Sequence, residues 1–358
     1  MKNIMILVIY LLQGLRILIN VNAVVYREAI RYDKLFSLTK HAFAYCDDNE
    51  LNIFIDLYPI LRSLYKPDYL EFKNPVDLCS CIINLGAHYK YFFRSYFQTE
   101  SKVYLINSLN LNKNNIRLYP EYNKEFKHRY ETRTPMVDAF VNQNIDLIDT
   151  IVSYLPNMYL INSTYESSVV IYDLINKFGN NKPNLIISRD LYPRQLIGLC
   201  NRTVLYRSKQ DRSYYVCKKN LYRSIIYDYK LNQDHYNFDN WSPKLLSLLF
   251  TLNKLECRKI KCEHTIPVAK AIIDRALNDM IIRNDYNSII DYTKLTDKDP
   301  YYMNNRFNVI DIPSQYNIYK NDIESTTYNI SDLYDPKSVR YICETYFNNM
   351  NQIDLNAF

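Results

Sequence analysis

The sequence predicts an α/β protein in which a parallel sheet carries helices on both faces. Short apolar runs alternate with longer segments of helical periodicity, which is typical of this class. The chain has 358 residues and a hydrophobic fraction of 48%, enough to bury a substantial core. Each apolar run also ends in polar residues, as strands do where they open onto a ligand crevice.

The apolar runs, all after residue 50, are too short for helices and are expected to be strands. They are residues 51–55, 103–106, 158–161, 185–187 and 203–206. The segments between them predict helices over 75–97, 135–155 and 165–178. Ser163 and Thr164 precede the last of these and Gly179 follows it, so both ends carry the expected cap residues.

The second half of the chain predicts a hairpin and then a helical region. Residues 208–224 alternate enough to form a hairpin with a basic surface. Pro243 and Pro267 lie near the starts of short helices, and the tail from residue 284 is weakly patterned until a helix after Pro336. The expected domains are an N-terminal helical extension over 1–50, an α/β domain over 51–240, and a helical C-terminal region and tail over 241–358.

Composition excludes several classes of site. The chain has only 4 glycines, all isolated, where average usage would give roughly 25, so it contains no glycine-rich phosphate loop. The 8 cysteines lack zinc-ligand spacing, and free thiols fit a reducing cytoplasm. A net charge of +6 permits a polyanionic partner. The abundance of Asn, Ile, Lys and Tyr suggests an AT-rich genome, such as that of a virus or phage.

The N-terminus has two interpretations. An apolar run over residues 4–12 followed by Ala23 would fit a secretory signal peptide. Gln13, Arg16 and Asn20 interrupt the apolar character, so a membrane span is not expected. The favoured interpretation is a helix that packs on the domain of a cytoplasmic protein, whether in a host cytoplasm or in a virion.

Polar residues follow the predicted strands and should meet at one edge of the sheet. Asp56, Asn107, Asn162 and Asp190 come after strands, and Glu166 begins the helix after the third strand. Carboxylates at such an edge can hold divalent cations such as Mg²⁺ or Mn²⁺. Three carboxylates could hold one ion, whereas a pair of ions would be under-neutralised. Each acid also has a structural interpretation, as a turn or cap residue or as a partner of the helix dipole.

The order of these parts resembles the 5′-3′ exonuclease and flap-endonuclease family, nucleases with a PIN-like fold. The stretch "FIDLYPILRSLY" is similar to the family's first strand, with Asp56 at its end and Arg62 on the next helix. "KVYLINS" resembles the second strand, with Asn107 where the family has an aspartate. "LYPEYNKEFKHRYETR" resembles the stretch below the family's helical arch and retains Pro120 and Glu121.

The resemblance continues to about residue 280. "STYESSVVIYDLI" is similar to the family's acidic helix, with Glu166 kept and neutral residues in place of the other acids. "IISRDLYPRQL" resembles its Asp-x-Asp loop, with Asp190 kept and Tyr192 in the second place. The segment from Ser242 resembles the helix-three-turn-helix region, without its usual acids and glycine-rich hairpin.

The resemblance implies a nuclease fold that acts on flap or single-stranded DNA, with most of its acidic metal site dismantled. The implied catalytic and metal-binding residues are Asp56, Glu166 and Asp190, with Mg or Mn as the cofactor if any metal binds. Cations that neutralise phosphates, interleaved here with tyrosines that stack on bases, are expected to bind the DNA. These are Arg62, Lys124, Lys127, Arg129, Arg207, Lys218 and Lys219.

Three functions follow from this pattern. The first is a DNA-binding protein of this fold whose catalysis is impaired or lost. The second is an active Mg- or Mn-dependent 5′ nuclease whose acid set is completed by Asp173, Glu100 or Asp68. The third is a non-enzymatic structural or interaction protein that uses its apolar N-terminus and tyrosine-rich tail for contacts.

Overall fold

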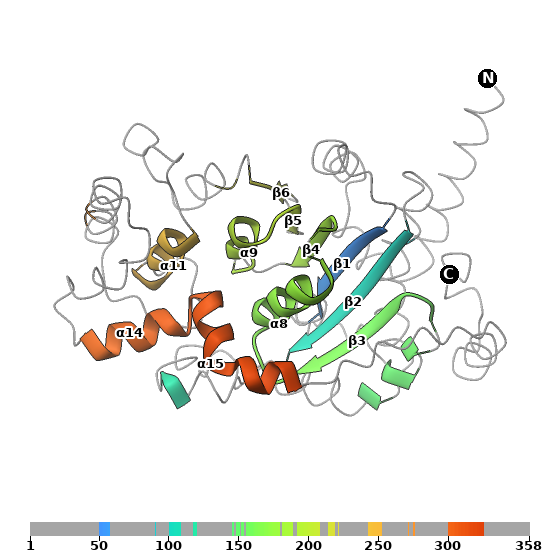
Figure 1. Cartoon of the computed structure of the whole chain (residues 1–358), viewed down its shortest axis with the longest axis horizontal. Coiled ribbons are helices and arrows are strands. Elements are labelled where there is room, and N and C mark those ends of the chain that lie inside the picture. The colour runs from blue at the N-terminus through green and yellow to red at the C-terminus, as the bar shows by residue number, and fades with distance from the viewer. Residues whose placement is uncertain are drawn as a thin grey trace, which may run out of the picture.

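The structure is a computed structural model of the chain (Figure 1). It describes a central sheet, the helices that pack on it and several short pieces between them. The described residues are 50–57, 90, 100–108, 117–119, 145–146, 148–150, 152–153, 155–179, 181–188, 192–207, 214–218, 221, 243–252, 271, 275 and 300–325.

The described part is built around a six-stranded sheet in the order β3-β2-β1-β4-β5-β6. Five strands are parallel, and β6 joins the edge antiparallel to β5. All five predicted apolar runs are strands, so the expected parallel α/β sheet is confirmed. The strands are β1 (Glu50–Asp56), β2 (Glu100–Ser108), β3 (Met158–Ser163), β4 (Asn184–Ser188), β5 (Thr203–Arg207) and β6 (Tyr214–Val216).

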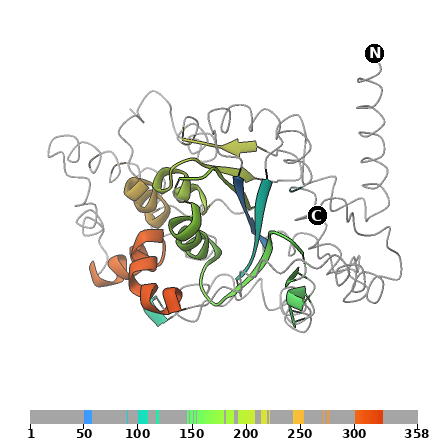
Figure 2. The same ribbon diagram turned by 45° about the vertical axis from the view of Figure 1, so that its right-hand side comes forward.

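Helices cover both faces of the sheet. In Figure 2 the coloured helices from the middle and the end of the chain lie on one side of the sheet, and the short helical pieces between residues 145 and 153 lie on the other. The helices on the first side are α8 (Ser167–Leu174), the π-helical turn η1 (Ile175–Gly179), α9 (Arg194–Leu199), α11 (Pro243–Leu252), α14 (Pro300–Asn308) and α15 (Ile312–Ser325).

The core on the α8 face starts from a row of aromatic rings across three strands. Phe54 stacks on Tyr104 with ring centroids 5.0 Å apart, and Tyr104 lies 5.2 Å from Tyr159. All three side chains are buried. Parallel register puts these residues on one face, because side chains alternate along a strand and pair across it. The same alternation places Asp56 on this face, two residues beyond Phe54.

The ends of α8 differ from the expected caps. Its N-cap is Glu166 rather than Ser163 or Thr164. The Ser163 hydroxyl instead accepts a hydrogen bond from the Tyr165 amide at 3.1 Å and shapes the turn before the helix. At the other end, η1 stops at Gly179, which does not adopt the left-handed conformation. A Cβ at Gly179 would lie 2.5 Å from Asn184 Oδ1, so close approach to β4 explains this glycine.

Within the predicted hairpin of residues 208–224, β6 is a strand, but it pairs antiparallel with β5 of residues 203–207, with Tyr206 opposite Tyr215, so the hairpin begins before the predicted segment. The helix expected after Pro243 is confirmed as α11, with Pro243 at its first position. Pro267, residues 1–49 and the expected helix after Pro336 lie outside the described residues. Among those that are described, no helix has the length and apolar character needed to cross a membrane.

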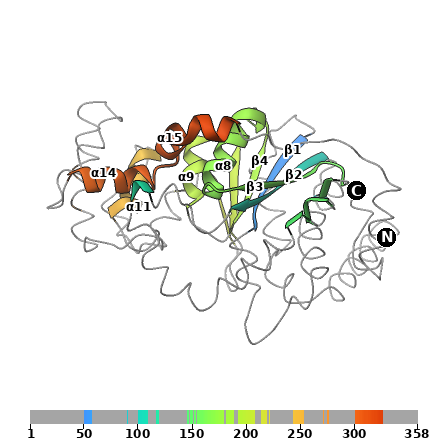
Figure 3. The ribbon, with the colours of Figure 1, turned by 90° about the horizontal axis from the view of Figure 1, so that it is seen from below.

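The weakly patterned tail was predicted wrongly, because residues 300–325 form α14 and α15. These helices run past α11 and along α8 (Figures 1 and 3). Hydrophobic periodicity misses them because their buried positions include Arg306, Asp311 and Gln315, each at most 2% exposed. Polar side chains can occupy a core when hydrogen bonds satisfy them, and such helices show a weak apolar stripe.

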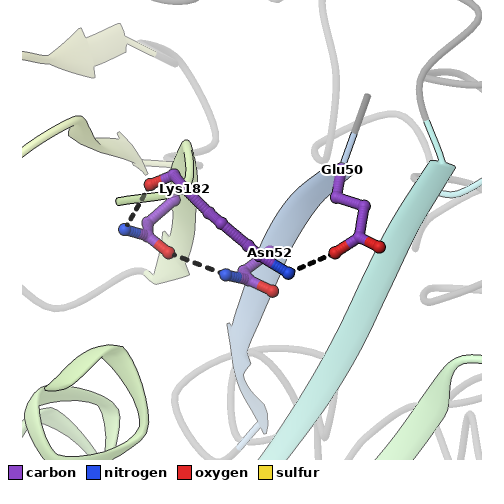
Figure 4. Close-up of polar contacts among 4 residues, drawn as sticks. Glu50, Asn52 and Lys182 are labelled. Carbon is purple, nitrogen blue, oxygen red and sulfur yellow. Dashed lines mark hydrogen bonds and ion pairs between the residues drawn. The ribbon is translucent and has the colours of Figure 1, made fainter. Parts of the chain in front are cut away.

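A polar corner holds the edge of the sheet where the strands begin. Glu50 forms an ion pair with Lys182, and Asn52 Nδ2 donates to Asn184 Oδ1 at 3.1 Å (Figure 4). Asn184 Nδ2 in turn donates to the carbonyls of Gly179 and Lys182, both at 2.9 Å. This corner joins β1, β4 and the end of η1 at the edge opposite to the expected ligand crevice.

Candidate functional site

The carboxyl ends of β1, β4 and β5 lie side by side. The Ser188 hydroxyl donates to Asp56 Oδ2 at 2.8 Å, and Ser188 pairs with Arg207 in the register of β4 and β5. Asp56 is 2% exposed and Ser188 is fully buried. The structure therefore brings the end of the first strand to the end of the strand that leads to Asp190.

Glu166 lies at the same edge of the sheet, where β3 passes into α8. It is the N-cap of α8, and its carbonyl accepts hydrogen bonds from the amides of Val169 and Val170 at 2.9 and 3.1 Å. The residue is 8% exposed, so its carboxylate is largely shielded from water. The N-terminus of a helix favours a negative charge, which agrees with a structural role for Glu166 as well as a functional one.

Asn107 and Asn162 form a polar pair near the carboxyl ends of β2 and β3, one position before Ser108 and Ser163. Asn107 Nδ2 donates to Asn162 Oδ1 at 3.0 Å. The register places Ile106 beside Asp56, so Asn107 is one position further along and points to the opposite face of the sheet. The expectation that Asn107 shares a cleft with Asp56 is therefore not met, because one residue along a strand reverses the side-chain direction.

Asp190 lies outside the described residues, two positions after Ser188. Tyr192, which the family resemblance sets in place of a second carboxylate, is described and half-buried. Its hydroxyl donates a short hydrogen bond to the Ile310 carbonyl and accepts one from Gln315 Nε2 at 2.5 Å. Tyr192 thus faces the turn between α14 and α15 and serves as a contact between distant parts of the chain.

Two acids that could have completed the carboxylate set lie elsewhere. Asp173 is fully buried, forms an ion pair with Lys177 at 2.8 Å, and accepts a hydrogen bond from the Tyr316 hydroxyl at 3.2 Å. Glu100 pairs in register with Glu50 at the start of the strands, at the opposite edge of the sheet. Neither can join Asp56, and Asp68 lies outside the described residues.

Two of the residues expected to bind DNA are described. Arg207 ends β5 beside Ser188, at the edge that carries Asp56. Lys218 is exposed and follows β6, whose antiparallel direction carries the chain toward the edge where β5 begins. The other five, Arg62, Lys124, Lys127, Arg129 and Lys219, lie outside the described residues.

The described residues do not fit a pair of divalent cations. No group of three His, Cys, Asp or Glu side chains that could hold a metal ion occurs in the part of the chain that the structure covers. Asp56 and Glu166 carry two negative charges, against four positive charges on two divalent ions. The neighbouring groups are serines and asparagines, which cannot neutralise a cation as a carboxylate does.

The sequence did not predict that α15 places Tyr319 and Asp322 next to Tyr165, the residue before Glu166. The centroids of the Tyr165 and Tyr319 rings lie 5.3 Å apart. The Tyr165 hydroxyl donates to Asp322 Oδ2 at 3.3 Å. Burial raises the pKa of the Tyr319 phenol, so it stays protonated at neutral pH. The helical spacing of Ile312, Tyr316, Tyr319 and Ile323 could have revealed this face.

Solved structures of nucleases are similar to this chain over most of its length. The flap endonuclease of bacteriophage T5, in a pseudo-enzyme-product complex with DNA and metal ions, is 13% identical with a TM-score of 0.48, over 83% of this chain and 98% of that one. The T5 5′-exonuclease with bound zinc is 14% identical with a TM-score of 0.48, over the same shares. The catalytic core of Rad2 in complex with DNA substrate is 10% identical with a TM-score of 0.40, over 88% of this chain and 91% of that one. No family model and no curated protein matches the sequence.

Proposed function

We propose that this chain is a DNA-binding protein with the fold of the 5′-3′ exonucleases and flap endonucleases, in which catalysis is reduced or lost. The main support comes from the Tyr192 hydroxyl, which forms hydrogen bonds with the Ile310 carbonyl and the Gln315 side chain. A neutral phenol cannot offset a cation's charge, and the hydrogen bonds of this one serve the turn between α14 and α15. Tyr192, which the resemblance aligns with the family's second loop carboxylate, therefore forms contacts within the protein instead.

The neutral rim supports DNA binding without metal ions. A cluster of carboxylates repels phosphates unless cations cover it, whereas serine and asparagine side chains do not. Of the neutral side chains around the carboxyl ends of the strands and the start of α8, Asn162 is exposed, whereas Asn107, Ser167, Ser168 and Ser188 are buried. An exposed amide at this edge and the net charge of +6 are compatible with a phosphate backbone.

The expected ligand is flap or single-stranded DNA. The cations that would bind its phosphates are those named from the sequence, of which Arg207 lies at the carboxyl edge of the sheet. Asp56, Glu166 and Asp190 would together hold at most one Mg²⁺ or Mn²⁺. The pattern of amino-acid usage is compatible with a viral or phage protein that acts in a cytoplasm or a particle.

The proposal is tested by measuring the affinity for flap and single-stranded oligonucleotides between 50 and 200 mM salt without metal ions. We expect the logarithm of the affinity to fall with the logarithm of the salt concentration, by about 0.7–0.9 for each phosphate contact. An affinity that does not change with the salt concentration would refute DNA binding. Cleavage in the presence of Mg²⁺ or Mn²⁺ that Asp190→Asn abolishes would instead establish an active nuclease.

Charge variants separate DNA binding from a purely structural role. Replacing Lys124, Lys127 and Arg129 with Gln should weaken binding and reduce the salt dependence by about one unit of slope per lost contact. Lys182→Gln is the matched control, because Lys182 pairs with Glu50 at the opposite edge of the sheet. If the triple variant and this control bind equally well, the basic cluster does not contact DNA and the interaction-protein hypothesis gains support.

A further inference from the structure

Helix α15 runs antiparallel to α8 and passes both ends of it (Figures 1 and 3). Near its middle, the Tyr316 hydroxyl donates to Asp173 on the second turn of α8. Further along, Tyr319 packs on the Tyr165 ring, and Asp322 accepts a hydrogen bond from the Tyr165 hydroxyl. Tyr165 directly precedes Glu166, so the end of α15 contacts the turn that contains this acid.

The start of α15 contacts the other turn of the candidate site. Tyr192 and Gln195 both donate to the Ile310 carbonyl, the latter at 3.0 Å. In return, the Ile312 amide donates to Gln195 Oε1 at 3.2 Å, and Gln315 Nε2 donates to the Tyr192 hydroxyl. Reciprocal hydrogen bonds therefore join the segment after β4 to the turn between α14 and α15.

Asp311 fixes the shape of that second turn. Its Oδ2 accepts hydrogen bonds from the Ser314 amide at 3.0 Å and the Ser314 hydroxyl at 2.7 Å, which caps the start of α15. Its Oδ1 accepts one from the Ser247 hydroxyl of α11 at 2.7 Å. The side chain is 2% exposed, and hydrogen bonds to a buried carboxylate are strong and directional. The Ile310 carbonyl is consequently presented to Tyr192 by a rigid turn.

We propose that residues 309–323 form a brace that holds the β3–α8 turn and the start of α9 at a fixed separation and thereby positions Glu166. Tyr165 and Tyr192 are the positioning residues at its two ends. The inference rests on the proposed function for the ligand that this edge binds, a DNA phosphate or a single cation. Binding sites need support that fixes their geometry to within about 0.5 Å, and a brace across two turns provides it.

Three tyrosines of this interface allow a matched test. Tyr192→Phe and Tyr165→Phe each remove one hydroxyl at an end of the brace and keep the ring. Tyr316→Phe removes a hydroxyl that donates to Asp173, at the end of α8 away from Glu166. Tyr165→Phe and Tyr316→Phe should lower thermal stability to a similar, small extent, and Tyr192→Phe somewhat more, because its hydroxyl both donates to Ile310 and accepts from Gln315.

Amide hydrogen exchange and DNA affinity then distinguish positioning from packing. We expect Tyr192→Phe to speed exchange about 5- to 100-fold in the peptide spanning residues 186–195, the fold-change that corresponds to two hydrogen bonds. Tyr165→Phe should speed exchange about 2- to 10-fold for residues 163–170, where one hydrogen bond is lost. Both should weaken binding of a single-stranded oligonucleotide by a similar factor, and Tyr316→Phe should leave the affinity unchanged.

The two readouts separate the brace from the proposed function. If the wild-type chain binds no DNA but the local exchange changes occur, the brace stands and the DNA-binding proposal fails. If the wild-type chain binds DNA and Tyr192→Phe alters neither exchange nor affinity, the brace is refuted. Equal effects of all three variants, in proportion to the loss of stability, would also overturn it, because they would reflect general packing.

Discussion

Replacing Gly179 with Ala should destabilise the protein through the polar corner at the start of the strands. A Cβ at this position would lie 2.5 Å from Asn184 Oδ1 and 3.3 Å from its Cγ. Asn184 cannot swing away, because it is fully buried and its amide donates to two carbonyls while its oxygen accepts from Asn52. The new methyl group must therefore displace a satisfied polar side chain or the end of η1.

The size of the effect follows from three contributions. Overpacking of a tight core costs about 1–3 kcal/mol. Separating Asn184 from Asn52 leaves buried polar groups without their partner and costs about 1–3 kcal/mol more. Alanine is better than glycine in a helix by about 1 kcal/mol, which offsets part of the loss. We expect a net loss of about 3 kcal/mol in the free energy of unfolding, within a range of about 1–5 kcal/mol.

Urea unfolding of the purified chain measures this loss. Gly198→Ala is the matched control, because the three atoms nearest to its Cβ would be apolar, with Pro243 Cγ at 3.0 Å. The control should cost less than Gly179→Ala, since helix propensity offsets part of this tight contact and the contact is with apolar atoms. Combining Gly179→Ala with Asn184→Ala should cost less than the sum of the single changes. An unaltered unfolding midpoint for Gly179→Ala would refute the reasoning.

Three further predictions concern other parts of the molecule. Asp311→Ala should lower the free energy of unfolding by about 2 kcal/mol in urea titrations, because it removes the α15 cap and a partner of Ser247. The hydrogen bond from Lys182 lowers the pKa of Glu50 below its ordinary value of 4.5. The stabilisation by this half-exposed ion pair is therefore present above pH 4.5 and is lost as the pH falls through the lowered pKa. Glu50→Gln should lower the free energy of unfolding by less than about 1 kcal/mol at pH 7 and should have no effect in strong acid. Burial raises the pKa of Cys200 to about 12, so peptide mapping should show it unmodified by iodoacetamide at pH 8 until urea unfolds the chain.

The strands and their order of appearance were predictable from the sequence. Each apolar run is bounded by polar residues, and its burial on both faces makes it continuously apolar, so the pattern is local and easily recognised. The strand at residues 214–216 and the helix from Pro243 were predictable for the same reason, since alternation and a proline at a helix start are local signals. The pairing of that strand with β5 was not predicted.

The placement of candidate site residues was only partly predictable. The rule that the carboxyl ends of parallel strands share an edge correctly brought Asp56 to the strand that precedes Asp190, as the hydrogen bond from Ser188 shows. The side-chain direction of Asn107 depends on strand register, which a shift of one residue reverses. The pairing of Asp173 with Lys177 and Tyr316 depends on a helix that lies far away in the sequence.

The sequence by itself thus determined the parallel sheet, because the hydrophobic effect acts on each strand and leaves a periodic trace in its residues. Only the tertiary structure decided the role of Tyr192 and the existence of α14 and α15. Several of their buried positions are polar and are stabilised by partners far away in the sequence, such as Ser247 for Asp311 and Gln195 for the turn at Ile310. Hydrogen bonds between such distant groups leave no periodic signal, because each partner is an ordinary polar residue until the fold brings the two together.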